Sequence, residues 1–302
     1  MNKYSIYGTL AVALSIVSCG SNISGVGSGS SSSSLSSFSE ASDEFTGSVN
    51  ILGGDPSDWT YYDPSGNRIV SADIGQTVSG KMTIVAANVS NGAWYEDNYS
   101  AHIYKNVTGN FAVAAKFKVM QADNFAIFPS SGDFKAAGFV IRDPSGSHSN
   151  NENWVMYNYG RNNGSSQREI KKTFVSGGSS RSTLYLNPQA SQTEHLLVCR
   201  VGSNFYFYYY DESGSQWIQE QYISGTTTRT GSGGALAEIS ESGTNTMYFN
   251  HSSIGSTARV GLITHSYISG SAQVRAEIDY VRFAATAPSS QSDCTSAFTT
   301  VD

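Results

Sequence analysis

The stretch AGFVIRDPSGSHSNNENWVMYNYG, residues 137–160, decides the fold. In its first part, Phe139 and Ile141 lie on one side of an extended chain and Arg142 on the other, because successive strand residues point to opposite faces. An Asp-Pro-Ser-Gly sequence follows, in which Pro presets φ, Gly accepts positive φ and Asp caps the backbone of a turn. The stretch therefore predicts two β-strands around a polar loop, with Phe139 and Ile141 in the core and Arg142 facing away from it.

The orientation of the second strand stays open. Trp154 and Met156 share one face, whereas Tyr157 and Tyr159 share the other. The alternation alone does not show which row is buried. If Arg142 shares an exposed face with Trp154 or with Tyr157, the pair of strands forms a ligand-binding platform; otherwise it is the middle of a sandwich.

Short alternating segments between turn residues recur along the chain, without an internal break between about residues 43 and 285. Such spacing predicts an all-β protein, a two-sheet antiparallel jelly-roll sandwich in a single domain. The run FYFYYY at 205–210 is aromatic on both faces, so that one row is core and the other is covered or faces a ligand. The candidate strands begin near Lys81, Asn110, Ala136, Asn153, Ser182, Glu194, Asn204, Ala258 and Ser271.

The composition favours the same fold class. Of the 302 residues, 12% are aromatic and 30 are Gly, which suits strands and turns. Only 14% are charged and the formal net charge is −6, so the chain lacks the basic patch that nucleic-acid binding requires.

The amino terminus resembles a bacterial lipoprotein signal, residues 1–19. Lys3 precedes a short apolar run, and Ile-Val-Ser-Cys at 16–19 resembles a lipobox. The resemblance implies lipidation of Cys19 with acyl chains such as palmitate, which would tether the protein to a membrane. Gly20 and Ser21 follow in place of an inner-membrane retention Asp, which favours the outer membrane of a bacterial cell envelope. The alternative is an ordinary cleaved signal with a chance cysteine.

Two segments look like flexible connections. Residues 20–42 are rich in Gly and Ser and predict a tether, and residues 286–302 predict a flexible tail. Cys199 lies in a predicted strand and Cys294 in the tail. An envelope compartment permits a disulfide between them, but a buried free Cys199 fits the sequence equally well.

Several motifs together resemble the concanavalin A-like lectin/glucanase superfamily: SDEFTGSVN at 42–50, the 137–160 unit, and the closing VGLITHS and EIDYVRF segments. More narrowly, the chain resembles sandwich modules of bacterial envelope proteins and the carboxy-terminal modules of some family-43 xylosidases. Its ends are also similar to family-16 laminarinases. The resemblance covers most of residues 43–285 and implies a two-sheet sandwich connected with carbohydrates.

The same resemblance implies a structural calcium ion where the first and last strands meet. The matching residues are Asp43, Glu44, the backbone at Gly47, and Asp279. Carboxylate and carbonyl oxygens are the ligands that calcium prefers. The alternative is that Asp43 and Glu44 are solvated edge charges and that Asp279 pairs with a nearby arginine.

Family-16 enzymes carry Glu-x-Asp-x-x-Glu on a central strand, the paired carboxylates that glycoside hydrolysis needs. The comparable segments here, 138–142 and 154–159, contain no carboxylate, so that mechanism is not supported. Other enzyme chemistry stays open: a glycoside hydrolase with loop carboxylates such as Glu152, or a polysaccharide lyase with Tyr, His and Arg.

Trp94, Tyr95 and Asp97 form a further candidate ligand-binding group in a loop flanked by Gly and Asn. Amphipathic rings on loops often serve as ligand platforms. Together with Arg142, Trp154 and Tyr157, these residues predict a sugar-binding surface. With the lipobox, they predict a lipid-anchored envelope protein whose sandwich binds a polysaccharide, as an accessory to its capture. The alternatives are a hydrolase or lyase with an unrecognised site, and a structural or adhesive lipoprotein that binds protein partners.

Overall fold

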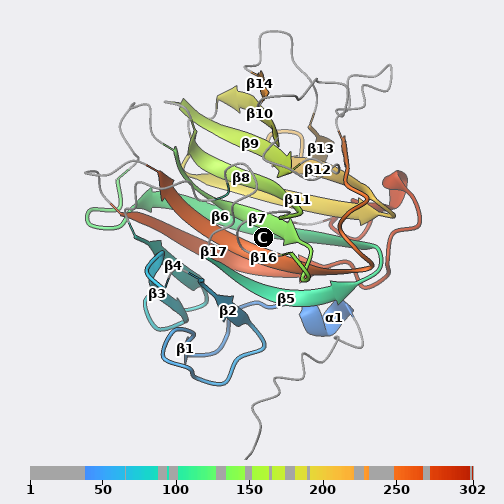
Figure 1. The fold of residues 1–302 in the computed structure, drawn as a ribbon. Helices are drawn as coiled ribbons and strands as arrows, with labels where there is room; N and C mark the ends of the chain where they lie inside the picture. The colour runs from blue at the N-terminus through green and yellow to red at the C-terminus, as the bar shows by residue number, and fades with distance from the viewer. Residues whose placement is uncertain are drawn as a thin grey trace, which may run out of the picture. The chain divides into compact units, whose positions relative to one another are not determined.

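The all-β class is confirmed by the computed structural model, in which two antiparallel sheets stack face to face (Figure 1). The helical elements of the described residues are the single turn α1 (Phe38–Ala41) and the 3-10 turn η2 (Gln291–Asp293). None of the described helices is long and apolar enough to cross a membrane. The structure describes residues 38–64, 66–87, 94, 101–126, 134–146, 152–162, 165–173, 181–188, 191–220, 228–230, 248–267, 273–299 and 301.

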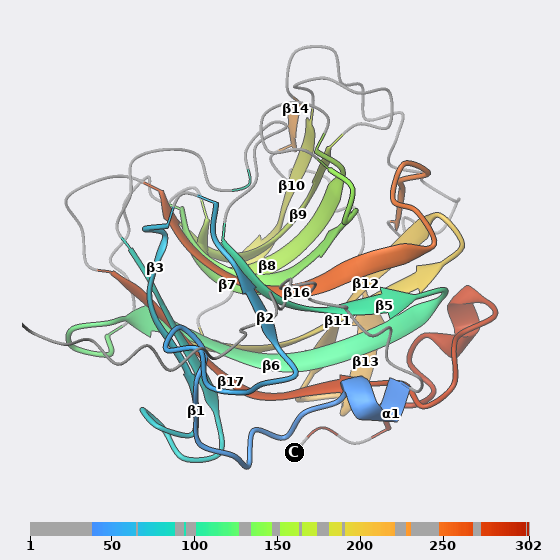
Figure 2. The same ribbon diagram turned by 60° about the horizontal axis from the view of Figure 1, so that its bottom comes forward.

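The eight-stranded sheet contains the strand pair on which the sequence analysis rests. Gly138 pairs with Asn158 and Arg142 with Trp154. Figure 2 shows that the sheet curves, with its concave side turned away from the other sheet. In spatial order its strands are β14 (Thr228–Thr230), β10 (Arg181–Pro188), β9 (Ser165–Thr173), β8 (Trp154–Asn162), β7 (Phe134–Arg142), β16 (Thr257–Tyr267), β5 (His102–Thr108) and β2 (Thr60–Tyr62).

The nine-stranded sheet covers the convex side of the first. Its edge strand β15 pairs with β12 alongside β13, outside the linear order. The strands are β1 (Val49–Asn50), β3 (Ile69–Ile74), β4 (Met82–Ala86), β17 (Val274–Phe283), β6 (Phe111–Gln121), β11 (Thr193–Val201), β12 (Asn204–Asp211), β13 (Gln216–Gln219) and β15 (Tyr248–Asn250).

The core lies between the two sheets. Phe139 and Ile141 are buried there, as the alternation predicts, and the Phe139 ring meets Phe117 edge-on with 5.2 Å between centroids. Burying one such side chain contributes about 1.5–3 kcal/mol. On β8 the inward row is that of Tyr157 and Tyr159, which settles the orientation that the sequence leaves open.

The tail and the start of the sandwich are more ordered than their composition suggests. Ala41, inside the expected tether, is buried, and Phe38 packs against the core. At the other end, Phe298 packs with Tyr206 and Tyr208 on the outer face of the nine-stranded sheet. Residues expected to form a flexible tail therefore cover the second aromatic row of β12.

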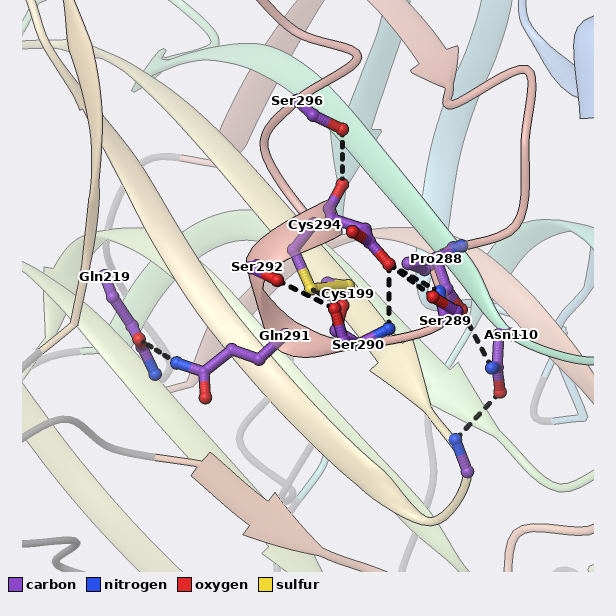
Figure 3. Close-up of a disulfide and its surroundings, with 12 residues drawn as sticks. Asn110, Cys199, Gln219, Pro288, Ser289, Ser290, Gln291, Ser292, Cys294 and Ser296 are labelled. Atoms are coloured by element: carbon purple, nitrogen blue, oxygen red, sulfur yellow. Dashed lines mark hydrogen bonds between the residues drawn. A yellow bond between two sulfur atoms is a disulfide. The ribbon is translucent and has the colours of Figure 1, made fainter.

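A disulfide between Cys199 and Cys294 holds this tail, so the structure resolves the alternative of a free Cys199. Figure 3 shows its surroundings, in which Asn110 donates a hydrogen bond to the Pro288 carbonyl at 2.9 Å. Farther along the tail, the Trp217 indole donates to the Phe298 carbonyl at 2.8 Å. Both cysteines are buried, so the bond is shielded from solvent.

Arg168 of β9 joins the eight-stranded sheet to the nine-stranded sheet through the core. It extends inward from β9 and forms ion pairs with Glu220 and with Glu194, the latter at 3.2 Å. Its guanidinium also lies over the Tyr209 ring, 3.8 Å from the centroid. Burial raises the pKa of Glu194 to about 7, in spite of the opposing charge of Arg168.

Removing the disulfide should destabilise the sandwich. The bond joins residues 95 positions apart, and closing a loop of this length is worth about 2–5 kcal/mol. In urea unfolding under oxidising conditions, the C199S/C294S variant should lose that amount relative to the parent chain. The exposed S292A variant, in the same turn, is the control. Equal unfolding free energies would contradict a structural role for the bond.

Candidate functional site

The concave face is defined here as the face of the eight-stranded sheet that points away from the nine-stranded sheet. Strand alternation and register place on it the side chains that do not enter the core. The described residues with side chains on this face include Tyr62, His102, Tyr104, Val140, Arg142, Trp154, Met156, Asn158, Glu169, Lys171, Arg259, Ile263 and His265.

The structure brings some of the sequence-predicted residues together on this face and separates others. Arg142 and Trp154 are register partners there, and Trp94 meets Trp154 edge-on, with 5.7 Å between the ring centroids. Tyr157 is on the other side of the sheet, fully buried in the core, where it donates a hydrogen bond to Glu220. Tyr95 and Asp97 lie outside the described residues.

Arg142 is engaged by the protein itself. Its Nε and Nη2 donate to the two carboxylate oxygens of Glu152, each at 2.8 Å, and Nη2 also donates to the Gly146 carbonyl at 2.7 Å. Both side chains of the ion pair are buried. A bidentate Arg–carboxylate pair of this kind fixes the loop after β7 to the strand.

The two tryptophans belong to an apolar cluster on the concave face rather than to an open platform. Trp94, Trp154 and Met156 are at most 1% exposed and pack with Val140 and Ile263. At the neighbouring Gly261, a Cβ would lie 3.1 Å from Val140 Cγ1, which is closer than ordinary van der Waals contact. This part of the face is therefore close-packed.

Beside the apolar cluster lies a group of polar side chains, called the polar row below: Asn158 of β8, Glu169 and Lys171 of β9, and His265 of β16. Asn158 Nδ2 donates to Glu169 Oε2 at 2.9 Å, and Lys171 Nζ lies 3.4 Å from Glu169 Oε1. All four side chains are buried. One acid and one base in ion-pair contact leave the row without net charge.

Two atoms of the polar row lack a hydrogen bond. Among the described residues, Glu169 Oε1 accepts no hydrogen bond and has only the ion-pair contact with Lys171, and His265 Nδ1 makes no hydrogen bond. Burial, with a smaller contribution from the Lys171 charge, lowers the pKa of His265 to about 3, so the ring is neutral at physiological pH. A buried polar atom without a hydrogen bond costs about 1–3 kcal/mol, so a further polar partner at these two atoms would stabilise the row.

Glycines leave the floor next to the polar row free of side chains. At Gly138, a Cβ would lie 2.2 Å from the Tyr157 carbonyl oxygen, and at Gly160 a Cβ would lie 2.2 Å from the Lys135 carbonyl oxygen. Only glycine permits so close an approach of β7 and β8. These two positions therefore carry no side chain, and Ala136 separates Gly160 from His265.

Sequence reasoning missed this row because it missed β9. The segment SSQREIKKT at 165–173 contains a single aliphatic residue and reads as a polar loop. In the structure it is a central strand, paired with both β8 and β10. The available signal was its alternation, with Arg168 and Ile170 on one face and Glu169 and Lys171 on the other, but hydropathy did not show which face was inward.

The expected calcium ligands do not converge. Asp43 accepts hydrogen bonds from the Trp59 indole and from the Phe45 amide, each at 2.8 Å. Glu44 forms a two-point ion pair with Arg282, with contacts of 2.6 and 2.9 Å.

Asp279, the remaining acidic residue of the expected calcium site, forms ion pairs with lysines. Asp279 is bound to Lys81 at 2.6 Å and to Lys116 at 3.6 Å, rather than to an arginine. Gly47 lines a hollow of about 510 Å³ together with Asp43 and Asp58. Among the described residues, no group of three or more acidic, His or Cys side chains is arranged to hold a metal. The four residues therefore do not fit a calcium site.

No family model and no curated protein matches the chain. Among solved structures, a xylan β-1,4-xylosidase from Bacillus halodurans C-125 aligns with 80% of this chain and 38% of its own length, at 14% identity and a TM-score of 0.45. Lectin I from Ulex europaeus, in complex with the methyl glycoside of α-L-fucose, aligns over 80% and 96%, at 12% identity and a TM-score of 0.43. A putative β-glucanase from Mycobacterium abscessus aligns over 80% and 98%, at 14% identity and a TM-score of 0.43.

These proteins are of the kinds that the sequence resemblance named. The chain spans well under half of the xylosidase. Since the likenesses are weak, the functional proposal below rests on the side chains of this chain.

Chelation should leave the stability of the sandwich unchanged, because Asp43, Glu44 and Asp279 already have protein partners. The melting temperature of the full chain, measured with and without EDTA, should be the same, and added calcium should not raise it. A melting temperature that falls with EDTA and recovers with calcium, but not with magnesium, would restore the calcium site.

Proposed function

We propose that the concave face binds a saccharide chain, with the polar row as the part that reads its hydroxyl groups. The observation that carries the proposal is the pair of buried atoms without hydrogen bonds, Glu169 Oε1 and His265 Nδ1, beside the glycine floor. Binding sites for small polar ligands commonly combine an apolar wall with a few placed polar groups. Here the polar row supplies the placed polar groups, and the close-packed apolar cluster borders it.

The donor and acceptor pattern of the row suits hydroxyl groups. A carboxylate accepts hydrogen bonds, an ammonium group donates them, and an amide does both. A hydroxyl group can donate to or accept from each of these groups. The neutral His265 offers one further donor or acceptor. Because the row has no net charge, an uncharged part of a sugar ring enters it without leaving a buried charge uncompensated.

The partners of the carboxylates favour saccharide binding over saccharide hydrolysis. A glycosidase needs two carboxyl groups that flank the scissile bond. Of the described acidic residues on or beside the concave face, Glu152 is held by Arg142 through both oxygens, which leaves Glu169 alone in the polar row. The low pKa of His265 also favours binding over catalysis, because it makes this histidine a weak general base.

Saccharide binding can be tested with the purified full chain on immobilised plant, algal and bacterial polysaccharides. We expect retention on at least one of them, and a loss of about tenfold or more in affinity for K171M and E169Q, since each removes a charge-assisted hydrogen bond.

The matched control is K118M, because Lys118 lies on the outer face of the nine-stranded sheet. Melting temperatures would show that all variants are folded. Absence of binding across the panel, or equal binding by K171M and K118M, would contradict the proposal. New reducing ends or unsaturated products would show that the face is catalytic instead.

We further propose that Cys19 carries the lipid anchor and that the sandwich is displayed at the cell envelope, in the outer membrane. A buried disulfide supports an oxidising compartment, because such bonds persist there and are rare in the cytosol. In a bacterial host, labelled palmitate should enter the parent chain and the S32A control but not C19A. Equal labelling of C19A, or its unchanged recovery with membranes, would contradict the anchor.

A further inference from the structure

We propose that Arg259 forms an anion-binding subsite at one end of the concave face, which takes the carboxylate or sulfate group of an acidic saccharide. The inference rests on the proposed saccharide binding and narrows its ligand class. The subsite lies apart from the polar row, and anion binding there can be measured without a polysaccharide.

Arg259 lies over two aromatic rings. Its guanidinium carbon is 4.5 Å from the centroid of Tyr104 and 5.1 Å from that of Tyr62. Two cation–π contacts of this kind restrict the guanidinium, whose N–H donors suit a planar anion. Arg259 and Tyr62 are half-buried, so the subsite is open to solvent on one side.

A second arginine lies directly across the strand pair. Arg142 of β7 is the register partner of Arg259 of β16, and like charges at opposed positions destabilise a sheet. Glu152 offsets only one of the two charges, because both of its oxygens bind Arg142. Among Arg142, Arg259 and Glu152, one positive charge is therefore in excess.

Among the described residues, Arg259 has no ion-pair partner, and its buried Nε makes no hydrogen bond. Two other arginines that lie over tyrosines do have carboxylates: Arg168 has Glu194, and Arg282 has Glu44. The buried Arg200, which has no carboxylate, donates instead to backbone carbonyls. Burial and the neighbouring Arg142 charge act to lower the pKa of Arg259, so its surroundings disfavour the charge that it carries. An anion bound at its edge would supply the missing partner.

The distance to the polar row fits a chain ligand. Arg259 and His265 of the polar row lie on the same face of β16, six residues apart, which is about 20 Å at the rise of a strand. A saccharide of a few rings covers this length. An acidic group at one end and neutral rings over the polar row would then match the charge of each part of the face.

The subsite can first be tested without any polysaccharide. Sodium sulfate and sodium glucuronate should each raise the melting temperature of the full chain by a few degrees more than sodium chloride at the same ionic strength, because ligands of the native state stabilise it. In R259Q this excess should disappear, and in R259K it should be reduced, since the charge remains but the planar fork is lost.

The matched control is R282Q. Arg282 also lies over a tyrosine, 4.1 Å from the Tyr280 centroid, but it has its own carboxylate. Its variant should keep the full excess. Sulfate acts on all proteins by exclusion from their surface, which the comparison between variants removes. An equal excess in R259Q and in the parent chain would overturn the proposal.

A matched pair of ligands identifies the anion. Oligogalacturonate should bind about tenfold more tightly than its methyl ester, or dextran sulfate more tightly than dextran, and R259Q should abolish the difference. Binding of acid and ester with equal affinity would overturn the subsite while leaving saccharide binding intact. An Arg259-dependent sulfate effect without binding to any polysaccharide would have the opposite meaning: the subsite stands and the proposed function fails.

Discussion

The buried guanidinium of Arg168 is the interaction on which the concave face depends. It projects from β9 into the core and reaches Glu194 of β11 and Glu220, which follows β13, so it ties the eight-stranded sheet to the nine-stranded sheet. Burying charges is costly, and removal of one partner of such a pair costs about 3–5 kcal/mol. The raised pKa of Glu194 shows that its burial outweighs the attraction of Arg168. Of the two carboxylates, Glu220 acts more strongly on the charge of Arg168.

Alternation along β9 transmits this inward anchor to the outward side. Arg168 and Ile170 point into the core, which fixes Glu169 and Lys171 on the concave face. A shift of one residue would bury the polar row between the sheets and expose the guanidinium. An inward arginine with two carboxylates thus specifies the register that the polar row needs, although apolar residues there would pack at lower cost.

Hydrophobic alternation was sufficient to predict the fold class and the core role of Phe139 and Ile141, because one side of β7 is plainly apolar. It did not decide between the Trp154 and Tyr157 rows of β8, because both rows are buried, in different apolar clusters on the two faces of the sheet. The disulfide, the partners of Asp279 and the polar row depend on contacts between distant segments, which alternation does not encode. β9 was missed because its inward positions include an arginine.

The net charge of the molecule limits how the Arg259 end can recognise an anion. With a formal net charge of −6, the chain repels polyanions at long range, and at physiological salt that repulsion is screened beyond about 8 Å. Recognition of an acidic group would therefore depend on contact with one guanidinium rather than on steering by a basic surface. Because that guanidinium is already held by Tyr62 and Tyr104, little side-chain entropy is lost on binding. A preorganised single contact gives selectivity for the position of the anion along the saccharide, which a diffuse basic patch would not.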